Sequence, residues 1–341
     1  MKIDVGISNY DLRAMPEYAR QAEALGYDCL WSSETQHDPF LPLAVAAAAT
    51  SKIRLGTSIA VAFPRSPMVL AYTAWDLQQA SGGRFILGLG SQVKAHNQRR
   101  FSVKFESPGP KLREVVLALR AIWECWQKGT PLKFEGQFYS FTLMTPFFNP
   151  GPIAQPEIPV YIAGVNHYMC RVAGEVCDGL HVHPFHSPKY LREYVHPAVE
   201  EGMRLAGRAR RDFSYATAAF VIVGDTEDER ARNAEAVRQQ IAFYASTRTY
   251  EPVLACHGWE RVTAELHRKS LEGDWKGMAG LISDEMLDTF AVCGRYGNMA
   301  AKLRERYDGL LDRVALYQPY EVRPDDPGLG RMVKDFAGSG G

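Results

Sequence analysis

Short apolar segments that end in small or polar residues recur along almost the whole chain. Amphipathic stretches separate them, and strands that alternate with helices form parallel sheets. Eight such units predict an α/β fold whose sheet closes into a (β/α)8 TIM barrel, with its chemistry at the carboxyl ends of the strands. The eight segments cover 3–8, 29–34, 53–60, 84–91, 160–164, 179–184, 215–224 and 313–319.

Two stretches interrupt this rhythm and are interpreted as insertions in the barrel. The first, at about 134–158, follows the clearest helical stretch, 111–128, and begins with a hairpin pattern over 134–141. The second, at about 248–296, has helical patterns and no strand signal over 248–290. Weak patterning of this kind is typical of variable loops on a rigid frame, so we expect both insertions to contribute to substrate binding.

The composition predicts one soluble domain and argues against nucleic-acid or membrane partners. Of the 341 residues, 46% are hydrophobic, and 39 basic residues balance 39 acidic ones. No basic block is present that would bind nucleic acid or anionic lipid. The longest apolar stretch, 40–49, is too short to span a bilayer. We expect a single domain over 1–337, followed by a flexible tail over 338–341.

The cysteines and the first residues of the chain predict a cytoplasmic protein. Six cysteines stand singly in apolar surroundings without a CxxC pair, which is typical of free thiols in a reducing compartment. The chain enters its first strand directly, without the basic and apolar regions of a signal peptide.

Seven segments, in the same order along the chain, resemble motifs of the luciferase-like monooxygenase superfamily. This is the barrel family of bacterial luciferase and of the dehydrogenases and reductases that use coenzyme F420, a deazaflavin. The chain is most similar to the F420-dependent oxidoreductase branch. The segments are Gly26–Glu34, Ile53–Ser58, Gly82–Ser91, Phe134–Tyr139, Ile158–Gly164, Ala173–Gly179 and Val223–Glu229.

The resemblance implies that the turn after the fifth strand holds the cofactor phosphate through Ala163, Gly164, Val165 and Asn166. The first N–H groups of a helix and its dipole favour anions, and glycine lets a phosphate approach the backbone. The alternative is an ordinary turn in which Asn166 only caps the following helix.

The resemblance also implies a non-prolyl cis peptide bond in the third strand, around Thr57, Ser58 and Ile59. The bond would join Ser58 to Ile59 and push a bulge under the cofactor ring. The alternative is an ordinary buried strand.

At the mouth of the fourth strand, Gly90 and Ser91 are expected to give the cofactor access and a hydrogen-bond donor. A dinucleotide fingerprint is rejected because Val93 stands where its third glycine should be. Luciferase-type flavin enzymes often present an arginine at this point, and its absence favours F420 over FMN. The following residues, including Asn97, are expected in a solvated loop.

Proton transfer is assigned to residues after the second and sixth strands. Glu34 is followed three residues later by His37, whereas the family commonly places a histidine directly after the acidic residue. An imidazole suits proton exchange near neutral pH, so His37 is the candidate acid or base. The alternative is a histidine of the surface loop, or one that only caps the adjoining helix. His183 is expected to line the pocket and orient the substrate. A metal at His181 and His183 would need three or four ligands, and no further ligands stand out, so no metal is expected.

These features together predict an oxidoreductase that transfers a hydride between coenzyme F420 and a small organic substrate. The alternatives are an FMN-dependent monooxygenase, a flavin-binding protein without catalytic activity, and a metal-dependent barrel hydrolase. The resemblance further implies a homodimer.

Overall fold

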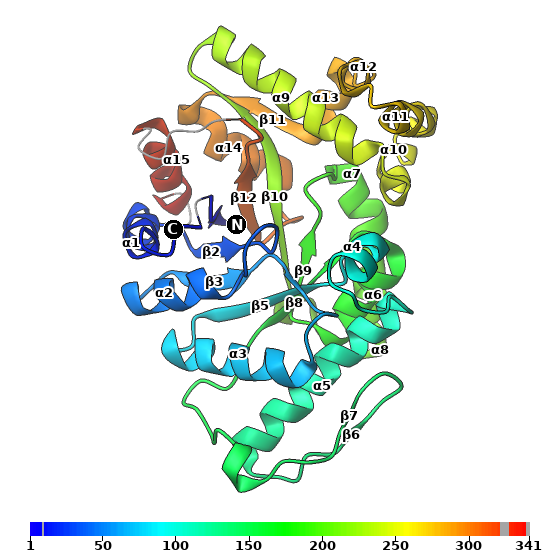
Figure 1. Cartoon of the computed structure of the whole chain (residues 1–341). Helices are drawn as coiled ribbons and strands as arrows, with labels where there is room; N and C mark the ends of the chain where they lie inside the picture. Colours follow the sequence, from blue (N-terminus) through cyan, green and yellow to red (C-terminus); the bar gives the residue numbers. More distant parts are fainter. Residues whose placement is uncertain (9, 321–326, 339–341) are drawn as a thin grey trace.

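A closed barrel of parallel strands forms the centre of the computed structural model, which describes residues 1–8, 10–320 and 327–338 (Figure 1). Neighbouring strands pair in parallel, and β12 pairs with β1 to close the sheet. The predicted (β/α)8 barrel is therefore confirmed. Around the barrel the strands are β1 (Lys2–Gly6), β2 (Cys29–Ser32), β3 (Arg54–Thr57), β5 (Phe85–Gly90), β8 (Val160–Gly164), β9 (Gly179–Val182), β10 (Ser214–Val223) and β12 (Arg313–Tyr317).

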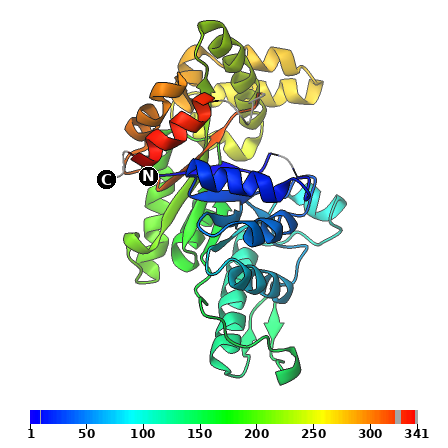
Figure 2. The ribbon, with the colours of Figure 1, turned by 90° about the vertical axis from the view of Figure 1, so that its left-hand side faces the viewer.

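Helices follow the strands and cover the outside of the barrel (Figures 1 and 2). Gly26 and Gly129 end two of them in the left-handed conformation, with φ of 96° and 66°. The helix expected over 111–128 begins earlier, at Pro108, because proline suits a first helical turn. The helices are α1 (Met15–Leu25), α2 (Leu41–Ala49), α3 (Pro67–Ala80), α5 (Pro108–Lys128), α6 (His167–Val176), α8 (His196–Leu205), α9 (Glu227–Ala245), α14 (Tyr296–Tyr307) and α15 (Pro327–Gly338).

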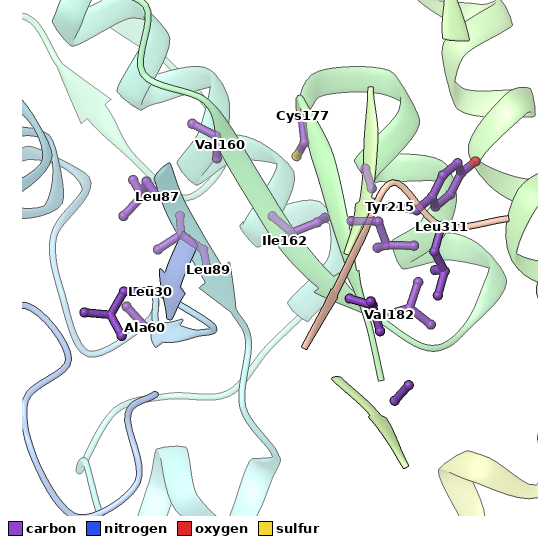
Figure 3. Close-up of a cluster of buried hydrophobic side chains, with 14 of the residues drawn as sticks. Leu30, Ala60, Leu87, Leu89, Val160, Ile162, Cys177, Val182, Tyr215 and Leu311 are labelled. Atoms are coloured by element: carbon purple, nitrogen blue, oxygen red, sulfur yellow. The ribbon is translucent and has the colours of Figure 1, made fainter. Parts of the chain in front are cut away.

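Successive strand residues face opposite sides of the sheet, and this separates two apolar regions. Outward side chains such as Leu30, Leu87 and Ile162 belong to the core between strands and helices (Figure 3). Inward side chains, including Trp31 and Tyr161, pack inside the barrel. These inward side chains fill the middle of the barrel.

The first predicted insertion contains the expected hairpin, made by β6 (Phe134–Glu135) and β7 (Ser140–Phe141) in antiparallel pairing. Glu114 on α5 fixes its turn, because the carboxylate accepts the backbone N–H groups of residues 137–139 at 2.6–2.9 Å. The hairpin is therefore tied to the helix that precedes it.

The second predicted insertion is helical over 248–290, as expected. It ends earlier than predicted, because the last residues of 248–296 form the strand β11 (Ala291–Gly294), which pairs in parallel with the carboxyl half of β10. Four residues are too few to stand out as an apolar segment. In both views α10–α12 lie at the opposite end of the molecule from the hairpin (Figures 1 and 2). The helices are α10 (Glu251–Ala255), α11 (Glu260–Glu272), α12 (Trp275–Ala279) and α13 (Asp284–Phe290).

Shorter elements complete the described part of the chain. After β5, the helix α4 (Lys94–Arg99) replaces the expected solvated loop. After β9, α7 (Pro188–Tyr190) continues through a π-helical stretch, Leu191–Val195, into α8. The strand β4 (Ala60–Val61) pairs with β5, and 3-10 turns cover Pro146–Phe148, Arg210–Asp212 and Arg248–Tyr250.

All six cysteines are unpaired, as the sequence predicted. Within the residues that the structure describes, no helix is long and apolar enough to cross a membrane. The single domain over 1–337 stays a prediction. Of the predicted tail, Gly338 ends α15, and residues 339–341 lie outside the described residues.

Candidate active site at the mouth of the barrel

A cavity of about 780 Å³ opens at the carboxyl end of the barrel strands and extends along β1 towards α1 and α15. Its walls come from β1, from the ends of β2, β9, β10 and β12, from Ser58 just after β3, and from side chains of α1 and α15. Both its place and its size suit a small organic ligand. Residues that line it include Gly6, Ile7, Trp31, Ser33, Ser58, His181, Val182, Thr217, Ala218, Gln240, Leu316, Tyr317 and Gln318.

The predicted cis peptide bond between Ser58 and Ile59 is present beside this cavity. The end of β2 holds it from one side: Ser33 Oγ donates to the carbonyl of Ser58 at 2.8 Å, and the N–H of Glu34 donates to the carbonyl of Ile59 at 3.2 Å. The N–H of Ser58 donates to the carbonyl of Ser32 at 2.7 Å. Hydrogen bonds from the neighbouring strand therefore fix the backbone on which Ser58 faces the cavity.

Thr57 and Gly90 support this segment from behind and do not line the cavity. The Thr57 hydroxyl donates to the carbonyl of Gly88 at 2.6 Å and accepts the N–H of Gly88 at 2.9 Å. Its hydrogen bonds are therefore made within the sheet. A Cβ at Gly90 would lie 2.6 Å from Cδ1 of Ile59. Glycine is needed there because the Ile59 side chain occupies the space.

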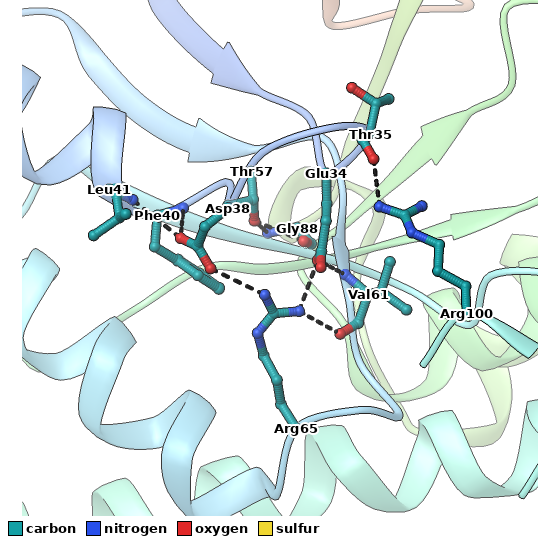
Figure 4. A network of polar contacts seen from close by, with 10 residues as sticks. All are labelled: Glu34, Thr35, Asp38, Phe40, Leu41, Thr57, Val61, Arg65, Gly88 and Arg100. Carbon is teal, nitrogen blue, oxygen red and sulfur yellow. Dashed lines mark hydrogen bonds and ion pairs between the residues drawn. The ribbon is translucent and has the colours of Figure 1, made fainter. Parts of the chain in front are cut away.

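Glu34 forms a buried polar network with Arg65 (Figure 4). Its Oε2 accepts the N–H of Val61 and a guanidinium N–H of Arg65, both at 2.7 Å, and only 6% of the side chain is exposed. Arg65 also pairs with Asp38 at 3.1 Å. Glu34 therefore anchors the strand that follows the cis peptide bond. This geometry favours a supporting role over the predicted part in proton exchange.

His37 lies at the rim, exposed, and does not line the cavity itself. Its ring stacks on Tyr10 with centroids 5.4 Å apart and an interplanar angle of 21°. The Tyr10 hydroxyl donates to the carbonyl of Ser33 and accepts its N–H, both at 2.8 Å. Ser33 lines the cavity, so Tyr10 connects His37 to the cavity wall. Its proposed proton exchange stays a prediction.

His183 does not line the cavity, contrary to expectation, and His181 does. The strand β9 ends at Val182, so His183 lies in the loop beyond it and the alternation of faces no longer applies. Its Nδ1 accepts the N–H of Phe185 at 3.1 Å, and its ring stacks on Tyr250 at 4.4 Å. Burial lowers the pKa of His183 to about 3, so the imidazole is neutral. Its contacts join the loop to the second insertion.

His181 is the cavity residue that the sequence analysis did not select. Its Nδ1 lies 3.5 Å from Ser58 Oγ, and its ring meets Trp31 edge-on at 4.8 Å. Burial, reinforced by the positive charge of Arg313, lowers the pKa of His181 to about 3. Its buried Nε2 faces Gly88 and the carbonyl of Thr57, because a Cβ at Gly88 would lie 2.7 Å from the nitrogen and 1.8 Å from that oxygen. A neutral imidazole therefore forms part of the cavity floor.

A buried ion pair lies inside the barrel below this imidazole. Arg313 on β12 contacts both carboxylate oxygens of Asp4 at 2.7 and 2.9 Å and reaches Asp28 at 2.5 Å. Trp31 donates its indole N–H to Asp4 at 2.9 Å. Burial alone would lower the pKa of Arg313, but the two carboxylates outweigh it and raise the pKa above its usual range. The pair joins the last strand to the first.

The predicted phosphate turn lies at the start of α6, outside the cavity lining. Asn166 caps the helix, with its Oδ1 accepting the N–H of Met169 at 2.9 Å. A cap leaves other N–H groups of the first turn without an intrahelical acceptor, so an anion can still bind there. A Cβ at Gly164 would lie 3.0 Å from Cδ1 of Leu180, within the packing between strand and helix. Ala163 and Val165 are half-buried beside it.

Ser91, after β5, is held by a residue that the sequence analysis placed in solvent. Asn97 on α4 is fully buried, and its Nδ2 donates to the carbonyls of Ser91 and Val93 at 2.8 and 3.1 Å. The amide thus shapes the turn at the mouth of β5. In the described part of the chain, no cluster of three histidine, cysteine, aspartate or glutamate side chains could hold a metal.

Comparisons with known proteins agree with this architecture. The family model described as luciferase-like monooxygenase matches residues 2–313. An uncharacterized protein of Mycobacterium tuberculosis is 47% identical over 336 residues, which is 98% of each chain. A 5,10-methylenetetrahydromethanopterin reductase of Archaeoglobus fulgidus is 28% identical over 90% of each chain.

Solved structures share the fold at low sequence identity. The coenzyme F420-dependent tetrahydromethanopterin reductase of Methanopyrus kandleri has a TM-score of 0.77 and 22% identity, covering 98% of this chain and 96% of that one. The oxygenating constituent of 3,6-diketocamphane monooxygenase from Pseudomonas putida, in complex with FMN, has a TM-score of 0.63 and 18% identity, covering 93% and 91%. The family match runs from β1 into β12, and it shows that the chain belongs to the luciferase-like monooxygenase family of oxidoreductase enzymes.

Proposed function

We propose that the protein is an F420-dependent oxidoreductase that transfers a hydride between the deazaflavin and a small organic substrate. The observation that carries this proposal is the cavity at the barrel mouth, bounded by Ser58 and the neutral imidazole of His181. The likeness in fold to the coenzyme F420-dependent tetrahydromethanopterin reductase, and the resemblance of the sequence motifs to the F420-dependent branch, support the choice of cofactor.

The residues at the cavity suit a flat tricyclic ring. Ile7, Ala218 and Leu316 supply apolar surface, while Ser33 and Ser58 supply hydroxyl groups. The neutral imidazole of His181 borders the cavity beside Ser58. In this proposal Ser58 and Ile59 hold the ring. The predicted phosphate turn over 163–166 at the start of α6 holds the phosphate, and Gly90 and Ser91 border the side chain between them.

A bound deazaflavin supplies a hydride when reduced and accepts one when oxidised. The chain itself binds and orients the substrate, excludes water and exchanges the proton. His37 at the rim is open to solvent and is the proposed proton-exchange group. Glu34, with its carboxylate engaged by Arg65, is proposed to hold the loop that carries His37. His183 is proposed to position the second insertion rather than the substrate.

FMN-dependent monooxygenation is the second candidate function. The FMN complex among the structural relatives supports it, and the lack of an arginine directly after β5 weighs against it. The two functions differ in what they consume. Reduced F420 should be oxidised by ketones or enones without oxygen, whereas a monooxygenase would consume oxygen together with reduced FMN.

The test is anaerobic turnover of reduced F420 with a panel of ketones and enones, followed by visible absorbance. Reoxidation of F420 that depends on both protein and substrate is the expected result. Oxygen uptake with reduced FMN, and no reaction with reduced F420, would favour the second candidate.

We also propose that the protein acts as a homodimer in the cytoplasm. The resemblance of the sequence to its family supports the dimer, and the six free thiols support a reducing compartment. Sedimentation equilibrium of the purified protein tests the dimer, and a monomer at micromolar concentration would contradict it.

A further inference from the structure

The cavity has a second wall, which lies across the barrel from Ser58. In the closed ring of eight strands, β3 is third and β10 is seventh, so they face each other across the mouth. Thr217 on β10, Gln240 on α9, and Tyr317 and Gln318 at the end of β12 line this side. We call these four residues the polar wall.

A hydrogen bond between two phenol groups fixes the polar wall. The hydroxyl oxygens of Tyr317 and Tyr244 lie 2.9 Å apart. The rings of Phe220 and His183 meet this pair edge-on, at 4.8 Å from Tyr317 and 4.6 Å from Tyr244. Packing on both sides therefore holds the two phenol groups in place.

The two phenol groups can share their hydrogen bond in either direction, because each hydroxyl is both a donor and an acceptor. Burial and the neighbouring Tyr317 raise the pKa of Tyr244 well above its usual range, so this phenol keeps its proton. When Tyr244 donates to the oxygen of Tyr317, the Tyr317 proton is available to a ligand in the cavity, which Tyr317 lines.

The described residues of the cavity lining offer no free charge. The one carboxylate, Asp4, is engaged by Arg313 and Trp31, the imidazole of His181 is neutral, and no lysine, arginine or glutamate is present. A carboxylate, phosphate or ammonium group of a substrate would lose its water there without gaining a counter-charge. Such a transfer is strongly unfavourable.

We propose that the polar wall selects an uncharged ketone or alcohol as substrate, with the Tyr317 hydroxyl donating a hydrogen bond to its oxygen. This inference rests on the proposed function. In the reduction, the carbonyl carbon gains a hydride and its oxygen gains a proton. The reduced deazaflavin gives up one hydride and one proton in total and becomes oxidised. Tyr317 binds and orients the oxygen.

The preference for an uncharged substrate is tested with two ketones that share the same reacting ring, cyclohexanone and 4-oxocyclohexanecarboxylate. Each is supplied with reduced F420. We expect kcat/KM to be at least about tenfold higher for the neutral ketone, since the anion must be desolvated. Gln318→Lys places a cation in the polar wall and should reduce this preference about tenfold. Equal kcat/KM for the two ketones in the wild type, or a preference for the anion, would overturn the inference.

Tyr317→Phe tests the donor. It should lower kcat/KM for cyclohexanone about tenfold, the effect of one lost hydrogen bond, and leave the affinity for F420 unchanged. Tyr72→Phe is the matched control, because that hydroxyl bonds to the carbonyl of Phe148 away from the cavity. Equal effects of the two variants, or no turnover of either ketone by protein that binds F420, would overturn the inference. Loss of F420 binding by the wild type would instead count against the proposed function.

Discussion

At the scale of single residues, neutral buried histidines distinguish this site from a conventional acid–base centre. His181 and His183 stay uncharged in the folded protein because burial lowers the pKa of each to about 3. His186, buried beside them, has its pKa lowered to about 4. The proposed proton exchange therefore falls to a group in contact with solvent, and His37 at the rim is the candidate.

These lowered pKa values predict how stability depends on pH. The unfolded chain binds protons at these imidazoles below about pH 6.5, whereas the folded chain does so only near pH 3–4. The free energy of unfolding should therefore fall as the pH drops from 6.5 towards 4. Replacing His181 by Asn should flatten this slope by about 1.4 kcal/mol per pH unit, as measured by urea denaturation. A slope unchanged in His181→Asn but flattened in His37→Asn would contradict this account.

Glu34→Gln separates a supporting carboxylate from a catalytic one. Loss of the charge leaves Arg65 with a weaker partner, so we expect about 2 kcal/mol less stability in urea denaturation. Turnover should fall only in so far as the backbone at Ser58 and Ile59 is held less firmly in place. Glu17→Gln, which breaks the exposed pair with Arg20, should change stability by no more than about 0.5 kcal/mol. Abolished turnover at unchanged stability would assign Glu34 to the chemistry instead.

Sequence reasoning located the cis peptide bond at Ser58, but it placed His183 in the cavity lining, where the structure has His181. The cis bond could be predicted because the third strand resembles a motif in which the family has such a bond. The placement of His183 depended on where β9 ends: had the strand continued by one residue, His183 would share the face of His181, but the strand ends at Val182. Asn97 was missed for a similar reason, because a buried amide on the short helix α4 looks like any polar loop residue in the sequence.

At the scale of elements, the start of α6 is the structure proposed to hold the cofactor phosphate. A side chain at Gly164 would enter the packing around Leu180, so a substitution there would disturb the fold as well as binding. Asn166 is exposed and caps the helix. It can therefore be changed without disturbing the core.

Asn166→Asp keeps a capping oxygen and adds a negative charge at the same point. Stability should be unchanged or slightly higher, because aspartate suits a helix start. Affinity for F420 should fall about tenfold through repulsion of its phosphate. Asn166→Ser keeps the cap without the charge and should bind F420 normally. Equal dissociation constants for the two variants in a fluorescence titration would place the phosphate elsewhere.

The order of strands and helices was predictable at this scale, because apolar segments mark the strands and amphipathic stretches between them mark the helices. The strand β11 and the helix α4 were not, because each is too short to show a period of its own. The secondary structure of such short segments depends on contacts with residues distant in the chain. The strand β11, for example, forms by pairing with β10.

At the scale of the whole molecule, the barrel is closed by its first and last strands, and a buried ion pair joins them. Arg313→Leu would leave Asp4 without its partner in the barrel interior. We expect a loss of about 3–5 kcal/mol in the free energy of unfolding, measured in urea. Arg210→Leu breaks the exposed pair with Asp312 and should cost no more than about 1 kcal/mol. Similar losses of unfolding free energy in the two variants would show that the buried ion pair does not stabilise the contact between the first and last strands.

The central claim is that the open rim of this barrel binds a deazaflavin. Equilibrium titration of the purified protein with oxidised F420, and separately with FMN, tests it most directly. We expect one F420 to bind per chain, about tenfold or more tighter than FMN. Saturable binding of FMN by a protein that does not bind F420 would contradict the claim.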